Sequence, residues 1–92
     1  MTNKQIVNAV STALNIPYEQ LKSKDRHRDV SDARSIAVAL ILKNTDITLK
    51  KLGAQFNRHH STLIHSREKY DELRERDINY ALKADACLDL LK

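Results

Sequence analysis

Cysteine, glycine, proline and aromatic residues are all scarce in this 92-residue sequence. The one cysteine, Cys87, has no partner for a disulfide within the chain, so we expect a small core or half-buried residue with no redox or metal role. One glycine cannot form a glycine-rich phosphate loop, which excludes ATP hydrolysis by this chain alone. With so few turn-forming residues, the composition favours a compact, mostly helical fold with an aliphatic core.

Long hydrophobic runs are missing as well. No stretch reaches the ~18 apolar residues that a membrane span requires, and the N-terminus lacks the apolar segment of a signal peptide. A chain of this length forms one domain, residues 1–92, and is too short for separate cofactor and substrate domains. We therefore expect a single cytoplasmic domain with no cofactor, no small-molecule substrate and no membrane partner.

The positive charge is concentrated in the middle of the chain. From Gln20 to Tyr70 eleven Lys/Arg stand against five Asp/Glu, a balance of +6, whereas Asp71 to Lys92 has a balance of −2. All four histidines also lie in the basic section. A basic face on a small domain is typical of a nucleic-acid partner and predicts association with the nucleoid, although a merely solubilising surface is the alternative.

Hydrophobic periodicity predicts an all-α bundle of about six helices. The expected helices run from Thr2 or Asn3 to Asn15, Tyr18 to Leu21, Ser31 or Asp32 to Asn44, Thr48 to Phe56, His60 or Ser61 to about residue 77, and about 77 to 91. The third is apolar nearly all round in its second half, so it should be the central helix. In the last, acidic helix the expected buried stripe comprises Ile78, Ala81, Ala84, Leu88 and Leu91.

The segment 52–66, LGAQFNRHHSTLIHS, holds most of the polar chemistry of the chain. It includes the only glycine, Gly53, and after Phe56 one short helix must stop at Asn57 and Arg58 before another begins. That arrangement is a helix-turn-helix. In this motif the N-terminus of the second helix enters the major groove of duplex DNA.

Side chains at the start of that second helix suit the reading of bases. Arg58 can donate two hydrogen bonds to guanine, His60 can donate to an acceptor, and Ser61 or Thr62 can serve either polarity. Thr62, His65, Ser66 and Lys69 would share one polar face, with apolar residues beside and behind them. The alternative is that the hydroxyls only cap the helix and the histidines are only exposed.

A second basic segment, SKDRHRDV at residues 23–30, is expected to form an exposed connection. Arg26 and Arg28 would then lie on a flexible arm that can reach the minor groove, where narrow A·T tracts attract arginine. The alternating signs also allow a solvated loop in which Asp25 and Asp29 pair with these arginines.

No constellation typical of an enzyme or a metal site is visible. The histidines have no carboxylate or thiolate within one helical turn except Glu68, and adjacent histidines at a helix start point in different directions. We therefore predict a non-enzymatic protein without metal.

Residues 23–69 closely match a known pattern. SKDRHRDVSDARSIAVALILKNTDITLKKLGAQFNRHHSTLIHSREK resembles the C-terminal DNA-binding domain of the bacterial replication initiator DnaA, whose pattern runs S-K-x-R-x-R-x-V-x-x-A-R-x-[IM]-A, a leucine-rich helix, then [LI]-G-x-x-F-G-G-R-D-H-[ST]-T-V-x-H-A. The resemblance covers roughly residues 6–70 and implies a small Trp-repressor-like bundle that binds duplex DnaA boxes, in replication initiation or transcription control.

The resemblance also implies DNA-contacting positions. Arg26 matches the minor-groove arginine, and His60, Ser61 and Thr62 match the H-[ST]-T of the recognition helix. The full expected set is Lys24, Arg26, Arg28, Lys50, Lys51, Arg58, His59, His60, Ser61, Thr62, His65 and Lys69. Of these, Lys50 and Lys51 replace the family's usual Pro-Glu and add positive charge.

Two departures from the family pattern lie in the turn. His59 replaces an aspartate, exchanging an obligatory acceptor for a group that can donate, which would remove a contact to a cytosine amino group. Asn57 stands where the family has two glycines, so the turn is shorter, but asparagine tolerates the left-handed conformation.

No ATPase segment precedes the matched region, and Met1 is followed at once by a helix start, which favours a stand-alone protein over a fragment. Two further functions stay open at this point. One is a protein-interaction module that retains the fold and docks a protein partner through its acidic last helix. The other is RNA binding, which the scarcity of aromatic stacking residues disfavours.

Overall fold

The computed structural model describes all residues, 1–92, and contains six α-helices and no strand. The helices are α1 (Asn3–Leu14), α2 (Tyr18–Leu21), α3 (Arg28–Asn44), α4 (Leu49–Phe56), α5 (His60–Arg76) and α6 (Ile78–Asp89). The predicted all-α bundle of six helices is therefore confirmed. None of these helices has the length and apolarity needed to cross a membrane.

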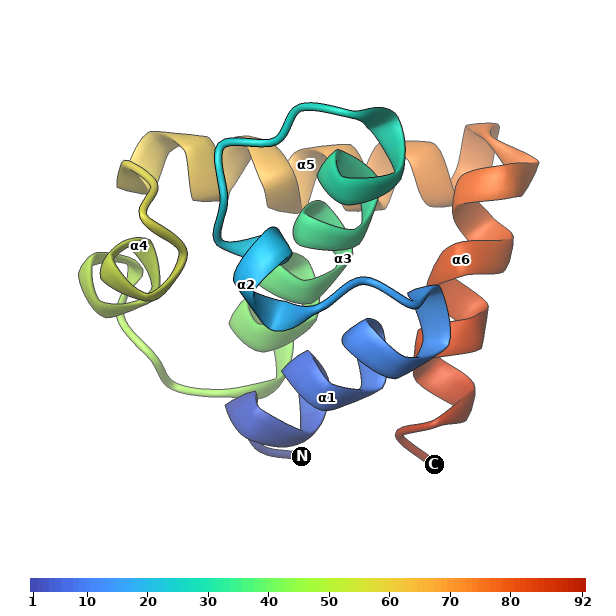
Figure 1. Ribbon diagram of the computed structural model, residues 1–92, viewed down its shortest axis with the longest axis horizontal. Coiled ribbons are helices and arrows are strands. Elements are labelled where there is room, and N and C mark those ends of the chain that lie inside the picture. Colours follow the sequence, from blue (N-terminus) through green and yellow to red (C-terminus); the bar gives the residue numbers. More distant parts are fainter.

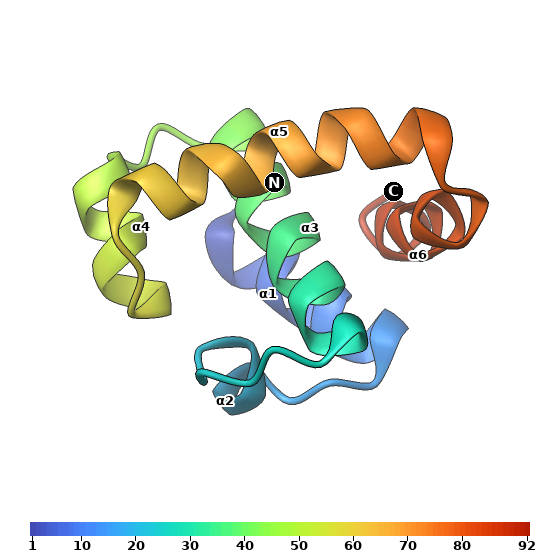
Figure 2. The same ribbon diagram turned by 90° about the horizontal axis from the view of Figure 1, so that it is seen from above.

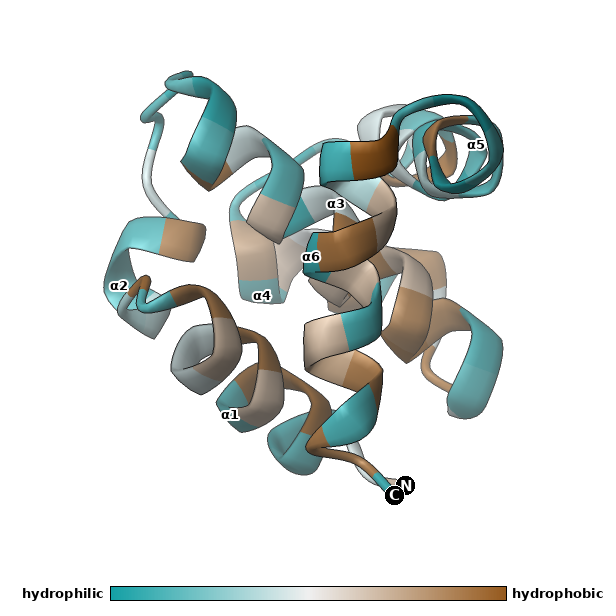
Figure 3. Ribbon diagram, turned by 90° about the vertical axis from the view of Figure 1, so that its right-hand side faces the viewer, coloured by the Kyte–Doolittle hydropathy of each residue, from teal (hydrophilic) through white to brown (hydrophobic).

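Helix α3 is the centre of the bundle, as predicted. It passes through the middle of the molecule, α5 crosses it, and α1 and α6 pack on the remaining sides (Figures 1 and 2). Eleven of its residues are buried, and eight of these are apolar: Val30, Ala33, Ile36, Ala37, Val38, Ala39, Leu40 and Ile41. Helix α5 has only two buried residues, Leu63 and Tyr70, and Figure 3 shows it largely in hydrophilic colours.

Local caps set most helix ends where the sequence predicted them. The side chain of Thr2 accepts a hydrogen bond from the backbone N–H of Gln5, whose own side chain accepts from the backbone of Thr2. This capping box satisfies amides that have no partner within the helix. Thr48 caps α4 and Asp77 caps α6 by a single side-chain hydrogen bond each, accepted from the backbone N–H of Lys51 and Tyr80, so these two starts are also confirmed.

The start of α3 was predicted too late. The helix begins at Arg28, three residues before Ser31, so Arg28 belongs to the helix and not to a flexible arm. Val30 is buried and holds the first turn against the core. Asp29 adds a favourable negative charge to that turn.

The predicted buried stripe of α6 was partly wrong. Ile78 is 76% exposed, and the buried residues of the helix are Tyr80, Ala84 and Cys87. Tyr80 can be buried because its hydroxyl forms a 2.7 Å hydrogen bond with Oγ of Ser35 on α3. The placement of Cys87 in the core is confirmed, and burial raises the pKa of its thiol to about 12.

Candidate nucleic-acid interface

Helices α4 and α5 form the helix-turn-helix, and Asn57 makes the turn between them. Its backbone is left-handed, with φ of 54°, which asparagine adopts more readily than most residues. The next backbone N–H, that of Arg58, donates to the carbonyl of Gly53 at 2.9 Å. A Cβ on Gly53 would lie 2.6 Å from the carbonyl oxygen of Arg58, so Gly53 allows the turn to fold closely onto α4.

The first turn of α5 presents a row of exposed polar side chains. His59 is the N-cap, and its ring nitrogen Nδ1 accepts a hydrogen bond from the backbone N–H of Ser61. The side chains of His60, Ser61, Thr62 and His65 follow, all exposed. These exposed donors and acceptors surround a helix N-terminus, the part of a recognition helix that meets base edges.

The guanidinium of Arg58 binds backbone carbonyls of the protein itself. Its Nη1 donates to the carbonyls of Phe56 and Asn57 at 3.2 and 3.1 Å, and its Nη2 donates to that of Ser23. In this arrangement Nε alone has no partner within the protein. Arg58 therefore fastens the helix-turn-helix to the basic segment that precedes α3.

A buried arginine, which the sequence analysis missed, holds that basic segment in place. Arg34 of α3 donates to the carbonyls of Leu21, Ser23 and Asp25 at 2.7, 2.9 and 3.0 Å. Burial and, to a lesser extent, the charge of Arg58 lower the pKa of Arg34. Because both arginines bind the carbonyl of Ser23, this oxygen joins the arm to the turn.

The arm, residues 23–27, is thus an ordered loop with exposed basic side chains. Lys24 and Arg26 are exposed, and neither takes part in an ion pair. Asp25 pairs with His27, and Asp29 with Lys83. The aspartates therefore do not pair with Arg26, and its charge is available to a ligand.

Arg28, which the sequence assigned to the same arm, is in a different environment. Its Nη2 lies 2.6 Å from a carboxylate oxygen of Asp77, and its Nε lies 3.6 Å from Asp32. Its side chain is nevertheless 68% exposed. Arg28 therefore remains accessible while it pairs with two carboxylates.

Asp25 shapes the arm through hydrogen bonds that predict a dependence on pH. Its Oδ1 accepts from the backbone N–H of His27 at 2.8 Å and lies 2.6 Å from the ring Nδ1 of the same residue, and its Oδ2 accepts from Gln20. These bonds, that from the backbone of His27 above all, lower the pKa of Asp25 to about 2. A carboxylate with a lowered folded-state pKa stabilises the fold above its ordinary pKa of 3.8, and this contribution is lost as the pH falls towards 2.

We expect acid to destabilise the wild-type protein more than Asp25→Asn, which cannot titrate here. Urea unfolding followed by circular dichroism, at about pH 5 and about pH 2, measures the difference between the two proteins. Every other carboxylate is common to both and cancels. A difference in unfolding free energy that does not change with pH would contradict this account of Asp25.

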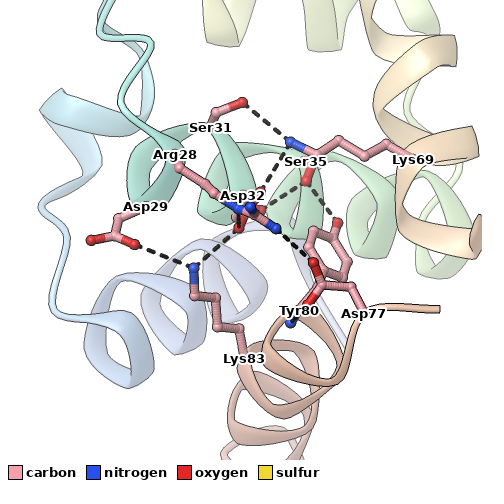
Figure 4. A network of polar contacts seen from close by, with 9 residues as sticks. All are labelled: Arg28, Asp29, Ser31, Asp32, Ser35, Lys69, Asp77, Tyr80 and Lys83. Atoms are coloured by element: carbon pink, nitrogen blue, oxygen red, sulfur yellow. Dashed lines mark hydrogen bonds and ion pairs between the residues drawn. The ribbon is translucent and has the colours of Figure 1, made fainter. Parts of the chain in front are cut away.

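Asp32 is the centre of a second polar cluster, also missed by the sequence analysis (Figure 4). Its side chain is only 3% exposed, and its two oxygens lie 3.1 Å from the ammonium groups of Lys69 and Lys83. Lys69 also donates to Oγ of Ser31 at 3.2 Å. Asp32 therefore joins α3 to α5 and α6, and Lys69, expected to contact DNA, is held towards the protein.

A polar hollow of about 170 Å³ lies between α3 and α5. None of its lining residues is apolar; they are Ser31, Arg34, Ser35, Arg58, Thr62, His65, Ser66 and Lys69. Four of the twelve expected site residues, Arg58, Thr62, His65 and Lys69, are thus brought to one depression. Lys24, Arg26, His60 and Ser61 lie outside this lining, as do Lys50 and Lys51, which are exposed in the first turn of α4.

Comparison with known proteins identifies the family. The model of the bacterial DnaA protein helix-turn-helix matches residues 3–69. The chain belongs to this family. Its relatives include chromosomal replication initiator proteins DnaA of Gloeothece citriformis, 30% identical over 80 residues, and of Oleidesulfovibrio alaskensis, 42% identical over 59 residues. These alignments cover 86% and 64% of this chain but only 18% and 13% of the relatives, so the chain spans less than a fifth of their length.

The DnaA helix-turn-helix match accounts for most of the site and leaves α6 outside. It includes the arm, the turn and α5 up to Lys69, and it excludes Asp77, Tyr80 and Lys83. The residues that support the site from within, Arg34 and Asp32, carried one usable signal in the sequence. Both are charged, yet they lie four residues before the apolar Val38 and Ile36 on a helix whose core face, apart from Ser35, is otherwise apolar. No three His, Cys, Asp or Glu side chains of this DnaA-type domain gather in a way that could hold a metal ion.

Proposed function

We propose that this chain is a non-enzymatic, sequence-preferring binder of double-stranded DNA with a DnaA-box-like site. The first turn of α5 enters the major groove, and Arg26 of the arm enters the adjacent minor groove. The observation that carries the proposal is the shared carbonyl of Ser23, which Arg34 and Arg58 both bind. Two basic elements far apart in the sequence are thereby held as one surface.

The polar hollow between α3 and α5 is suited to a DNA phosphate. Arg34 and Arg58 converge on the oxygen of Ser23, and the proximity of their like charges disfavours the pair in the absence of an anion. A phosphate above them would relieve this repulsion and accept hydrogen bonds from the hydroxyls of Thr62 and Ser66, which line the hollow. Exposed Lys24, Lys50 and Lys51 supply further sequence-independent contacts.

Fluorescence anisotropy across a salt series tests the proposal directly. A labelled DnaA-box duplex and a scrambled duplex are titrated with the protein between about 50 and 200 mM salt. With about six phosphate contacts we expect the affinity to fall about a thousandfold over that range, and the box to be bound more tightly than the scrambled duplex. A flat salt response, or no binding at low salt, would refute the proposal.

Substitutions separate base reading from phosphate binding. Arg26→Ala and His60→Ala should each reduce discrimination between box and scrambled duplex by about tenfold. Lys51→Ala, the matched control in the same motif, should weaken both duplexes equally and lower the salt slope by about one. If all three variants lost affinity equally for both duplexes, Arg26 and His60 would not be residues that read the base sequence.

A protein-interaction module is the second candidate, and α6 favours it. Ile78 and Leu82, one helical turn apart, are 76% and 60% exposed, beside exposed Asp85 and Asp89. Apolar segments alternate with polar ones along this helix (Figure 3). The same salt series distinguishes the two candidates, because a protein-interaction module would not bind duplex DNA with an affinity that falls steeply as salt rises. Competition with structured RNA distinguishes duplex DNA from RNA as the ligand.

A DNA-binding role implies a cellular context as well. We propose that the protein acts at the nucleoid in the cytoplasm, in replication initiation or in transcription control. This part of the proposal rests on the family and on the expected ligand.

A further inference from the structure

The imidazole of His59 has a defined tautomer, because its cap hydrogen bonds fix which nitrogen carries the proton. The backbone N–H of Ser61 lies 3.2 Å from Nδ1, and Oγ of Ser61 lies 2.8 Å from the same atom. A backbone N–H can only donate, so Nδ1 must supply its lone pair. In the neutral ring the proton is then on Nε2, and the hydroxyl of Ser61 also donates to Nδ1.

The position of the ring is set on two sides. The cap bonds hold one edge against the first turn of α5. The ring of His60 lies beside it, with centroids 4.1 Å apart and planes inclined by 34°, so the expectation that these two histidines point in different directions was wrong. His59 is exposed and takes part in no ion pair, so no carboxylate competes for its Nε2–H. The N-terminus of the recognition helix therefore carries one oriented N–H donor whose partner must come from outside the protein.

We propose that His59 is a specificity-determining residue that donates from Nε2 to an acceptor on a base edge in the major groove. The acceptors available there are O6 and N7 of guanine, N7 of adenine and O4 of thymine, whereas cytosine offers only an amino donor. His59 thus selects against cytosine at the position it faces. This inference rests on the proposed function, since it presupposes that the first turn of α5 enters the major groove.

Two substitutions isolate the polarity of this contact from its structural role. Asp and Asn are both good N-caps and have the same shape, so His59→Asp and His59→Asn should each keep α5 capped. Once an oxygen is used for the cap, Asn still presents an N–H₂ donor, whereas Asp presents only a second acceptor. The Asn variant therefore keeps a hydrogen-bond donor at this position, whereas the Asp variant replaces the donor with an acceptor.

Selection from a library of randomised duplexes, carried out at about pH 8, provides the readout. At one position the wild type and His59→Asn should disfavour cytosine by about five- to tenfold, and His59→Asp should change that preference to cytosine. If all three proteins select the same bases, or if the wild type selects cytosine at the position that His59→Asp alters, the inference is overturned. If none of the three proteins, the wild type included, binds duplex DNA, the proposed function is refuted, and this inference with it.

A second measurement examines the tautomer without DNA. A long-range ¹H–¹⁵N spectrum of the free protein at about pH 8 reports which ring nitrogen of His59 is protonated. We expect a protonated Nε2 and a bare Nδ1. The opposite tautomer would overturn the inference while leaving duplex binding by the domain unaffected.

Discussion

Asp32→Ala should lower the free energy of unfolding by about 3 kcal/mol, the largest loss expected from any polar substitution in this chain. The carboxylate is almost completely buried, and it compensates the ammonium groups of Lys69 and Lys83, whose side chains are 32% and 26% exposed. Without it, Lys69 loses its ion-pair partner, and Lys83 keeps only the exposed Asp29. For a domain of this size the melting temperature should fall by roughly 15 °C, measured by thermal unfolding and circular dichroism.

Asp29→Ala is the matched control for this prediction. Asp29 also pairs with Lys83, at 3.3 Å, but its side chain is 84% exposed. An exposed pair contributes little, so the loss should stay below about 0.5 kcal/mol. Equal effects of the two alanine variants would mean that burial of the carboxylate is not what makes Asp32 important.

Arg34→Met should have the second large effect, on both stability and DNA binding. Its guanidinium satisfies the carbonyls of Leu21, Ser23 and Asp25, and methionine of similar length leaves all three without that partner. The unfolding free energy should fall by about 2 to 3 kcal/mol. The affinity for a DnaA-box duplex should fall by at least about tenfold, because the arm that carries Arg26 is no longer fixed relative to α5.

Comparison with Arg26→Ala separates the two roles. Arg26 is exposed and forms no ion pair, so its removal should weaken duplex binding while leaving the urea unfolding midpoint unchanged. Arg34→Met should change both quantities. A well-folded Arg34→Met protein with wild-type affinity would show that anchoring of the arm is not needed for binding.

Much of the fold was predictable because local signals determine it. Thr2, Thr48 and Asp77 cap the helices that the periodicity predicted, and Asn57 adopts the left-handed conformation expected of it. Each of these features depends on a few neighbouring residues, so a linear sequence is enough to find it. The same holds for the exposed polar row at the start of α5.

The failures have a common physical cause, since all of them depend on contacts between distant segments. The carbonyl of Ser23 that Arg34 and Arg58 share, and the ammonium groups around Asp32, come from other segments of the chain. Likewise, Tyr80 is buried in preference to Ile78 because Ser35, 45 residues away, supplies its hydrogen-bond partner. No periodicity within one helix contains this information.

Helix α6 belongs to the folded core of the domain, although it lies beyond the segment that matches the family model. The match to the family model ends at residue 69, yet Tyr80, Ala84 and Cys87 complete the core, Asp77 pairs with Arg28, and Lys83 pairs with Asp32. The segment that matches the family model is therefore shorter than the segment that forms the core. Any excision, fusion or transplant of this DNA-binding unit should place its junction beyond residue 91, because a cut at residue 69 would remove Tyr80, Ala84 and Cys87 from its core.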